Sequence, residues 1–414
     1  MRVVPASSIP RGLGPLAHDF EAVLDEVLRG RGTGPIADVA KMGPTVAEVS
    51  RVYNAGLAGS LHRAPLDGRI AFSFARDVPK GAAAVRELVQ AGLIDPSETR
   101  PLRVLDLGAG LGAITWGIAR AVFPRPVEAL LVDDDDEVLA AASGIARTAA
   151  KLGAGEAKLS IETRRASLGL GMKGMSEPAD VVVLGQVLSE LDGDRPADAR
   201  VTAHAALAMD LLDRLVAENG ALVIIEPALR ERSRHLHAVR DLLAAKGRTV
   251  FAPCLHAEPC PMLTAGPTEW CHDDLPVDLP PWLVPLARAA GLRFQGLTFA
   301  HLVLRRDRQT LREASSTPSG SGSTAKLHLR VVSDQLVSKG KVEIFGCTSA
   351  GVRERLRRLD RDAPPRNESD PWTSLVRGDV VTVDVPPNDD EALAAFAKRR
   401  IPSAAAVDVW RGRR

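Results

Sequence analysis

The stretch Arg103-Val-Leu-Asp106-Leu-Gly108-Ala-Gly110-Leu-Gly112 joins a short apolar run to three glycines at alternate positions. The apolar run predicts a buried strand over Arg103–Leu107, and a helix is predicted over Ile114–Val122, directly after the glycines. Glycines in such a turn permit positive φ and let the backbone approach a ligand at the carboxyl edge of a parallel sheet. The spacing D-x-G-x-G-x-G is close to the dinucleotide pattern G-x-G-x-x-G but differs from it. A turn that only packs a helix on a strand is the competing interpretation.

The alternation of strands and helices continues along the chain. Further buried strands are predicted at Ala129–Val132, Asp180–Leu184 and Ala221–Ile225. Further helices are predicted at Asp136–Leu152, Ala197–Glu218 and Arg234–Lys246. This order predicts an α/β fold with a parallel, Rossmann-like sheet that helices cover on both faces.

The second of these strands ends at Asp133-Asp-Asp-Asp136. A carboxylate at this position can accept hydrogen bonds from both ribose hydroxyls of NAD or of an adenosine-containing cofactor. Because Asp106 precedes the glycines and no G-x-x-x-x-G-K-[ST] motif is present, the site is similar to that of class I S-adenosylmethionine (SAM)-dependent methyltransferases. By that similarity the glycines would face the methionine part of SAM, and Asp133 its ribose. The predicted cofactor-binding residues are Asp106, Gly108, Gly110, Gly112, Asp133 and Gln186.

No catalytic residue is predicted. After the strand at 180–184 the chain reads Gly185-Gln-Val-Leu-Ser-Glu190. Amino-directed nucleic-acid methyltransferases resemble one another at this position in an N/D-P-P-Y/F motif. The departure from that motif argues against methylation of an exocyclic amine.

The composition along the chain predicts five parts. Residues 1–100 form a helical N-terminal region, 101–305 a class I methyltransferase-like domain that carries three cysteines, and 306–325 a flexible Ser/Gly-rich linker. Residues 326–390 form a small β-rich domain, and 391–414 a basic tail. The helices of the first part are expected at Ala17–Leu28, Thr45–Leu57 and Gly81–Ala91. The strands of the β-rich part are expected at Leu327–Val332, Lys341–Phe345 and Val380–Val385.

Length and composition exclude several classes of protein. A chain of 414 residues with 45% hydrophobic and 25% charged residues predicts two or three globular domains and argues against a disordered or collagen-like chain. No apolar run approaches the roughly 18 to 20 residues of a membrane span, and the N-terminus lacks the apolar core of a secretory signal. We therefore expect a cytoplasmic protein without a membrane partner.

The charge is distributed unevenly although the net charge is only +1. The residues from Arg305 onward contain 21 Lys and Arg against 15 Asp and Glu, a net charge of +6, so that the rest of the chain carries −5. This asymmetry indicates either a polyanion-binding C-terminal part or a solvated basic face. With one Tyr, five Trp and nine Phe, the composition gives little support to a stacking platform for single-stranded bases.

The only cysteines are Cys254, Cys260, Cys271 and Cys347. Four thiolates suit a tetrahedral site for zinc or an iron-sulfur cluster, and the C-x₅-C-x₁₀-C spacing is looser than that of zinc knuckles. Ordinary buried thiols are an alternative, and a disulfide framework is less favoured. His256 and His272 are left outside the ligand set. If Cys347 joins the other three, a metal links the two folded parts, and Cys347→Ser is expected to detach the C-terminal domain.

Several short signatures occur in an order that resembles the methyltransferase-like family of the mitochondrial small ribosomal subunit and its bacterial relatives. The resemblance covers about residues 70 to 385. Its signatures are Ile225-Glu-Pro227, Ser233–Leu243, Ala252-Pro-Cys254, Cys260-Pro261, Trp270-Cys271-His272, Val332-Ser333, Lys339-Gly340 and Cys347-Thr348.

The resemblance implies a class I methyltransferase domain with a 4Fe-4S cluster on Cys254, Cys260, Cys271 and Cys347, zinc being the alternative metal. It implies S-adenosyl-L-methionine as cofactor, and small-subunit rRNA and ribosomal proteins as partners during assembly or translation. We expect an assembly role that uses the fold as an RNA-binding platform. The alternatives are an active SAM-dependent rRNA methyltransferase with a structural metal site and a small-molecule methyltransferase with a zinc staple. The oligomeric state is not determined by the sequence; a monomer is the favoured expectation.

Overall fold

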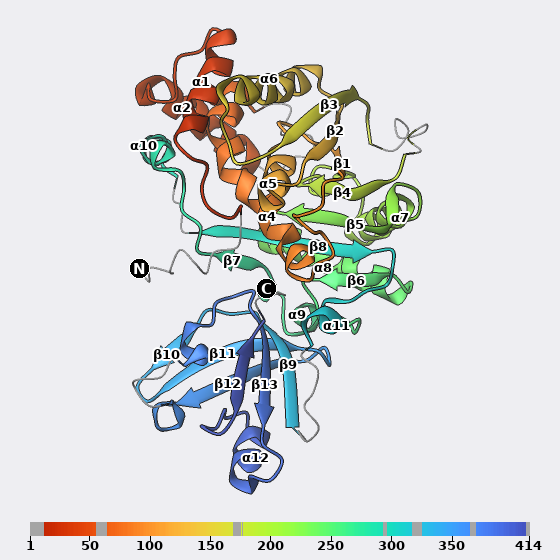
Figure 1. Cartoon of the computed structure of the whole chain (residues 1–414), viewed down its shortest axis with the longest axis vertical. Helices are drawn as coiled ribbons and strands as arrows, with labels where there is room; N and C mark the ends of the chain where they lie inside the picture. Colours follow the sequence, from red (N-terminus) through yellow and green to blue (C-terminus); the bar gives the residue numbers. More distant parts are fainter. Residues whose placement is uncertain are drawn as a thin grey trace.

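The computed structural model describes residues 12–54, 64–168, 175, 177–292, 296–316, 325–364 and 370–410. Two sheets divide these residues (Figure 1). The larger sheet and its helices occupy the upper part of the view, and the smaller sheet, in blue, lies below. No helix among these residues is long and apolar enough to cross a membrane.

The large sheet has the strand order β3-β2-β1-β4-β5-β8-β6, with β7 paired to β8. The first five of these strands run parallel, whereas β8 is antiparallel to both β5 and β6. The strands are β1 Leu102–Leu107, β2 Val127–Asp133, β3 Leu159–Arg165, β4 Ala179–Gly185, β5 Val216–Glu226, β6 Thr249–Ala252, β7 Asp273–Leu275 and β8 Leu297–Arg305. The four strands predicted from apolar runs are confirmed as β1, β2, β4 and β5, and the predicted parallel sheet is correct for the half that contains them.

Helices cover both faces of this sheet because the buried strands carry apolar side chains on both sides. Val181, Val183 and Val223 belong to the core beneath α5, whereas Val182 and Leu184 belong to the core that contains α7 and α8. The helices of this part of the chain are α5 Ala113–Ala121, α6 Asp136–Leu152, α7 Ala197–Arg214, α8 Arg230–Ala245, α9 Pro261–Thr264 and α10 Val284–Ala289.

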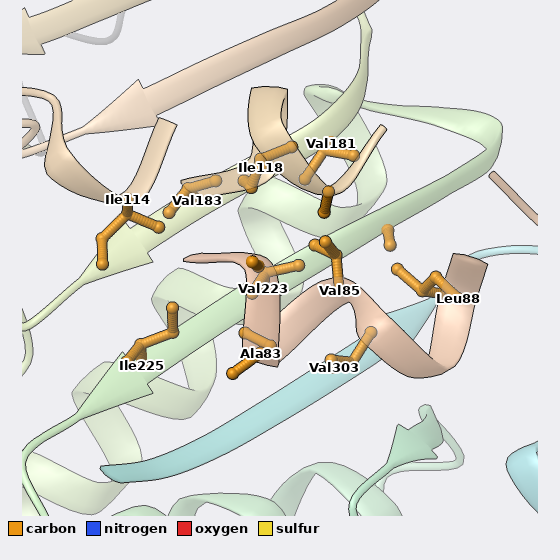
Figure 2. Close-up of a cluster of buried hydrophobic side chains, with 14 of the residues drawn as sticks. Ala83, Val85, Leu88, Ile114, Ile118, Val181, Val183, Val223, Ile225 and Val303 are labelled. Atoms are coloured by element: carbon orange, nitrogen blue, oxygen red, sulfur yellow. The ribbon is translucent and has the colours of Figure 1, made fainter. Parts of the chain in front are cut away.

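The N-terminal helices pack directly on the methyltransferase-like sheet domain. They are α1 Asp19–Gly30, α2 Val39–Asn54, α3 Leu66–Gly68 and α4 Phe74–Gln90, with a π-helical turn at Arg69–Ser73. Ala83, Val85 and Leu88 of α4 lie among the side chains of α5, β4, β5 and β8 (Figure 2). The last helix of the predicted N-terminal region is therefore part of the core of the sheet domain.

The backbones of α4 and α5 touch where two glycines face the opposite helix. A Cβ atom on Gly117 would lie 1.9 Å from the carbonyl oxygen of Val78, and one on Gly81 would lie 2.0 Å from that of Ile114. No side chain can occupy this crossing unless the helices separate.

Gly117→Ala is therefore expected to lower the free energy of unfolding by about 3 kcal/mol, the upper end of typical overpacking costs. Urea unfolding followed by circular dichroism measures the change. Gly144→Ala is the matched control, because its Cβ would meet nothing closer than 3.9 Å. We expect that substitution in α6 to stabilise the protein by about 0.5 to 1 kcal/mol. Equal effects of the two substitutions would contradict this account of the crossing.

The C-terminal sheet has the order β10-β11-β9-β13-β14, with β12 paired to β11. Its strands are β9 Ala325–Val331, β10 Leu336–Ser338, β11 Lys341–Thr348, β12 Arg353–Leu359, β13 Val380–Val385 and β14 Ala406–Val409. Trp372 is fully buried at its centre, and its indole N–H donates to the Val342 carbonyl at 3.2 Å.

Two parts of the chain differ from the sequence expectation. Within the predicted linker, α11 Leu311–Ser315 forms a short helix with a Thr310 capping box, and the Ser315 hydroxyl lies 3.2 Å from His328 of β9. The predicted basic tail contains α12 Asp390–Ala397 and β14, which pairs with β13. Apolar side chains such as Phe396 give these segments a buried face. The prediction of a basic tail considered only the net charge and not these apolar positions. Residues 317–324 and 411–414 lie outside the described residues.

Buried charges join the two sheets. Arg330 of β9 donates to Glu87 of α4 at 2.5 Å and to Asp273 of β7 at 3.2 Å. Arg86 also contacts Asp273, at 2.9 Å. All four side chains are less than 9% exposed. Burial raises the pKa of Glu87, but the guanidinium groups of Arg330 and Arg86 outweigh that effect and lower it to about 2. These carboxylates therefore stay ionised and hold the C-terminal domain on the sheet domain.

Candidate functional site

The glycine-rich turn lies between β1 and α5 at the carboxyl edge of the parallel strands. The backbone N–H groups of Gly108 and Ala109 both donate to the carbonyl of Val132 in β2. Gly110 has a φ of 53°, and its N–H donates to the Asp133 carboxylate at 2.9 Å. The end of β2 thus fixes the turn. The Asp133 carboxylate, which is predicted to bind the ribose, is hydrogen-bonded directly to the glycine turn.

A cavity of about 870 Å³ opens above this turn. One end is walled by the turn and by the segments after β2 and β3, at Gly108–Leu111, Asp133–Asp135 and Ala166–Leu168. The other end is walled by α2, α4, the end of β4 and the segment Pro227–Leu229. The volume lies within the range of sites that enclose a small molecule or cofactor.

Four of the six predicted cofactor residues line this cavity, namely Gly108, Gly110, Asp133 and Gln186. Asp106 and Gly112 do not. Asp106 is 1% exposed, and it accepts a hydrogen bond from the Thr115 hydroxyl at 2.7 Å. Burial raises the pKa of Asp106 to about 7. Gly112 begins α5 with a φ of 77°, and a Cβ there would lie 2.9 Å from Leu131. Asp106 is therefore enclosed below the turn, and Gly112 lets the chain enter α5 close to Leu131. Neither residue forms the wall of the cavity.

Sequence reasoning missed Arg69, which lines the cavity from the π-helical turn before α4. A Cβ on Gly110 would lie 3.3 Å from its guanidinium. Burial lowers the pKa of Arg69, and the nearby carboxylates of Asp133 and Asp135 oppose that shift. No sequence signal singled out this arginine, because only the fold brings residue 69 to a turn that begins at residue 108.

The cavity wall also holds a hydrogen-bonded group around Gln186, which follows β4 with a φ of 63°. The Tyr53 hydroxyl donates to the side-chain oxygen of Gln186 at 2.8 Å, and the Gln186 amide nitrogen donates to Asp77 at 3.2 Å. Asp77 in turn pairs with Lys80 and Arg76, each at 2.9 Å. A non-glycine residue with positive φ is costly, and such residues concentrate at functional sites.

Close to this group, Glu226 ends β5 and accepts a hydrogen bond from the Leu188 N–H at 2.9 Å. Burial raises the pKa of Glu226 to about 7. Tyr53 and Asp77 come from helices of the N-terminal region, where the sequence showed only helical periodicity.

All four cysteines line a second, smaller cavity of about 40 Å³ between the two sheets. Cys254 follows β6, Cys260 precedes α9, Cys271 precedes β7, and Cys347 lies in β11. The Cys260 N–H donates to the Asp241 carboxylate at 2.9 Å, and the Cys347 sulfur lies 3.3 Å from His256 Nε2. His272 does not line this cavity.

Burial raises the pKa of Cys260, Cys271 and Cys347, and the proximity of the other sulfurs adds to the shift. Burial, followed by the proximity of Cys254, raises the pKa of Cys260 to about 12. Four thiolates would therefore need a cation between them to coexist. Within the described part of the chain, no group of three or more His, Cys, Asp or Glu side chains has the arrangement of a metal site.

The strand order, with β8 reversed between β5 and β6, and the glycine turn above β1 define a class I methyltransferase fold. Residues 69–359 match the family described as Mitochondrial small ribosomal subunit Rsm22, and the chain belongs to this family. The expected family resemblance is thereby confirmed. No curated protein matches the chain in sequence.

Solved methyltransferase structures are similar at low identity. Precorrin-6y C5,15-methyltransferase from Geobacter metallireducens is 13% identical with a TM-score of 0.30, over 53% of this chain and 86% of its own. An O-methyltransferase family protein from Burkholderia thailandensis is 19% identical with a TM-score of 0.31, over 64% and 68% of the two chains. Magnesium protoporphyrin IX methyltransferase from Synechocystis PCC 6803, solved with bound SAM, is 13% identical with a TM-score of 0.30, over 56% and 83%.

Proposed function

We propose that the protein binds SAM in the 870 Å³ cavity and a 4Fe-4S cluster on its four cysteines, and that it acts on the small ribosomal subunit through rRNA. The observation that carries the proposal is the convergence of every cysteine of the chain on one cavity beside a class I methyltransferase sheet. The description of the chain's family, Mitochondrial small ribosomal subunit Rsm22, supports action on that subunit.

Three groups of this cavity fit the ribose and the methionine part of SAM. The Asp133 carboxylate is an acceptor for the ribose hydroxyls, because one of its oxygens is already oriented by the Gly110 N–H. The backbone from Gly108 to Gly110 lines the cavity and suits the methionine chain. Arg69 supplies a partly buried cation near Gly110, as the α-carboxylate requires. When bound, SAM would supply an electrophilic methyl group to a nucleophile admitted to this cavity.

The cysteine cavity fits a cluster by the chemistry of its donors. Four sulfur ligands select zinc or iron-sulfur clusters over hard cations. The site is largely buried, and Arg240 and Arg330 line it. Their positive charge favours the thiolate form of the ligands, since both guanidinium groups lower the pKa of Cys347 against the larger effect of burial. The same charge would offset the net negative charge of a thiolate-bound cluster.

The group around Gln186 supports an assembly role over an active methyltransferase. The amide oxygen of Gln186 accepts from Tyr53, and its amide nitrogen donates to Asp77, so both ends of the side chain already have protein partners. No N/D-P-P-Y/F motif is present to hold an amine. Transfer of labelled methyl from SAM to naked small-subunit RNA would favour the alternative of an active rRNA methyltransferase.

Cys271→Ser is expected to reduce the iron content of anaerobically purified protein from about four atoms per chain to less than one, with loss of the broad absorption near 400 nm. The reason is that a hydroxyl is a poor substitute for a thiolate ligand. Elemental analysis with sulfide determination and the absorption spectrum measure this.

His272→Ala is the matched control. It changes the adjacent residue outside the cavity and is expected to leave the iron content unchanged. Stoichiometric zinc in a colourless wild-type protein would replace the cluster in this proposal with a zinc site, and absence of any metal would refute both. Co-sedimentation of the wild-type protein with small ribosomal subunits tests the ribosomal part separately.

A further inference from the structure

The C-terminal sheet presents an aromatic and basic surface next to the cysteine cavity, where Phe345 packs in one cluster with Cys347 and Val332. In the antiparallel pairing of β11 with β12, Phe345 lies opposite Arg355 and Cys347 lies opposite Arg353. Because side chains alternate along a strand, these residues share one face of the sheet. The buried Ile344 and Leu356, also a cross-strand pair, belong to the hydrophobic core on the other face.

Phe345 holds two guanidinium groups close to its ring. The guanidinium carbon of Arg353 lies 4.1 Å from the ring centroid, and that of Arg355 lies 5.9 Å from it. The Phe345 ring is partly exposed, and the Arg355 side chain is 53% exposed. A planar guanidinium held over an aromatic ring is a surface on which a nucleobase can stack.

A second basic run of the chain borders this face. Arg357 forms a bridge with Arg400, and its backbone N–H donates to the Arg399 carbonyl at 3.1 Å. The segment Lys398–Arg400 therefore lies beside β12, although more than 40 residues separate the two in sequence. We define the β12 face as Phe345, Arg353, Arg355 and Arg357, which share one side of the sheet; the Arg399 side chain pairs with Glu354 on the other side.

Carboxylates are present around the β12 face but do not neutralise it. Glu269 pairs with Arg353, Glu343 with Arg355 and Lys341, and Glu354 with Arg399. Among the ion pairs of the described residues, none involves Arg357 or Lys398, both of which are exposed. Glu269 is 38% exposed, and ion pairs at the surface contribute only about 0 to 1 kcal/mol, so a phosphate can displace Glu269 from Arg353. Glu343 is buried, but the Arg355 side chain that it contacts is 53% exposed and can also reach a phosphate.

We propose that the β12 face binds a single-stranded segment of RNA. This inference rests on the proposed action on rRNA and assigns a surface to it. Alternate residues of β12 are about 6.8 Å apart, and Arg353, Arg355 and Arg357 thus form a row of cations along which an extended strand can lay successive phosphates. The Phe345–Arg353 pair stacks a base, which a purely electrostatic patch would not do.

The test is fluorescence anisotropy of full-length protein with a fluorescein-labelled 15-nucleotide oligouridine. For the double variant Arg355→Met with Arg357→Met, we expect the Kd to rise at least 10-fold and the slope of log K against log[salt] to fall by about 1 to 2. Phe345→Leu keeps an apolar side chain beside the cysteine cavity but removes the ring. We expect it to raise the Kd about 5- to 100-fold while leaving the salt slope unchanged.

The control removes the same charge elsewhere. Arg214 and Arg248 are partly exposed arginines of the sheet domain, each paired with one aspartate. Arg214→Met with Arg248→Met is expected to change the Kd less than 2-fold. If the β12 variants bind like this control, the assignment of the face is refuted. Equal or tighter binding of a 15-base-pair duplex would refute recognition of a single strand.

The outcome for the wild-type protein separates this proposal from the proposed function. If wild-type protein binds neither the oligonucleotide nor small ribosomal subunits, the proposed action on rRNA fails, and the face proposal fails with it. If wild-type protein binds and the β12 variants bind equally well, only the face proposal fails. SAM affinity and iron content measured on each variant must equal those of wild type, which shows that the two cavities are intact.

Discussion

Replacing Arg330 by methionine is expected to lower the free energy of unfolding by about 3 to 5 kcal/mol, because it leaves two buried carboxylates with one guanidinium group in place of two. Glu87 would retain only Arg86 at 3.3 Å and His301 at 3.9 Å, and Asp273 would keep Arg86 at 2.9 Å and His301 at 3.3 Å. Methionine fills a similar volume, so the loss reports charge and hydrogen bonding rather than a cavity. In metal-free protein, where no cluster links Cys347 to the other three cysteines, we also expect the two sheets to separate, since Arg330 is the charged residue of the C-terminal domain at the centre of this contact.

Urea unfolding measures the stability of this variant, and small-angle X-ray scattering measures the separation as an increased radius of gyration. Arg361→Met is the matched control, because Arg361 is an exposed arginine of the same domain. Its effect is expected to stay within about 0.5 kcal/mol. An unchanged radius together with wild-type stability for Arg330→Met would show that the ion pairs do not hold the domains together.

The same contact changes the expectation for Cys347→Ser. From the sequence alone, a metal bound by Cys347 and the other three cysteines links the C-terminal domain to the sheet domain, and Cys347→Ser is expected to detach it. The structure adds Arg330 with Glu87 and Asp273, and the contact of Ser315 with His328. We now expect Cys347→Ser to lose metal while the domains stay together, with a radius of gyration equal to that of wild type.

Asp133→Asn is expected to weaken SAM binding about 10- to 100-fold, because a hydrogen bond to a charged group contributes about 1.5 to 3 kcal/mol. The substitution keeps the size of the side chain but replaces one acceptor oxygen with a donor. That donor would face a backbone N–H in either orientation, of Gly110 or of Asp135, and would replace an acceptor for the ribose hydroxyls. Titration calorimetry with SAM and with S-adenosylhomocysteine measures the two affinities.

The control for this prediction is Asp136→Asn. Asp136 follows in the same acidic run, but it pairs with Arg165 at the surface, is 67% exposed and does not line the cavity. Its substitution is expected to leave SAM affinity within 2-fold of wild type. Equal losses in both variants would mean that the general negative charge of this run, and not a specific contact of Asp133, supports binding.

Local signals in the sequence predicted the parallel half of the sheet and much of its cofactor edge. Buried parallel strands read as continuous apolar runs, which identified β1, β2, β4 and β5. The apolar pattern does not predict the edge strand β3, because most of its side chains are exposed and Leu159–Arg165 reads as a polar segment. The reversed β8 was also missed, since its role depends on its partners β5 and β6 rather than on its own pattern.

The sequence by itself determined the class of fold, the glycine turn with Asp133 above it, and the set of four cysteines, because each depends on residue types at short spacing. The tertiary structure alone decided which distant residues complete these sites. It brings Arg69 and Tyr53 to the cavity, Arg330 to Glu87, and Lys398–Arg400 to β12. The physical reason is that periodicity reports only which side of an element is buried. Which element packs against that side is set by contacts between segments far apart in the chain. In such contacts each buried charge requires a partner of opposite charge from another segment.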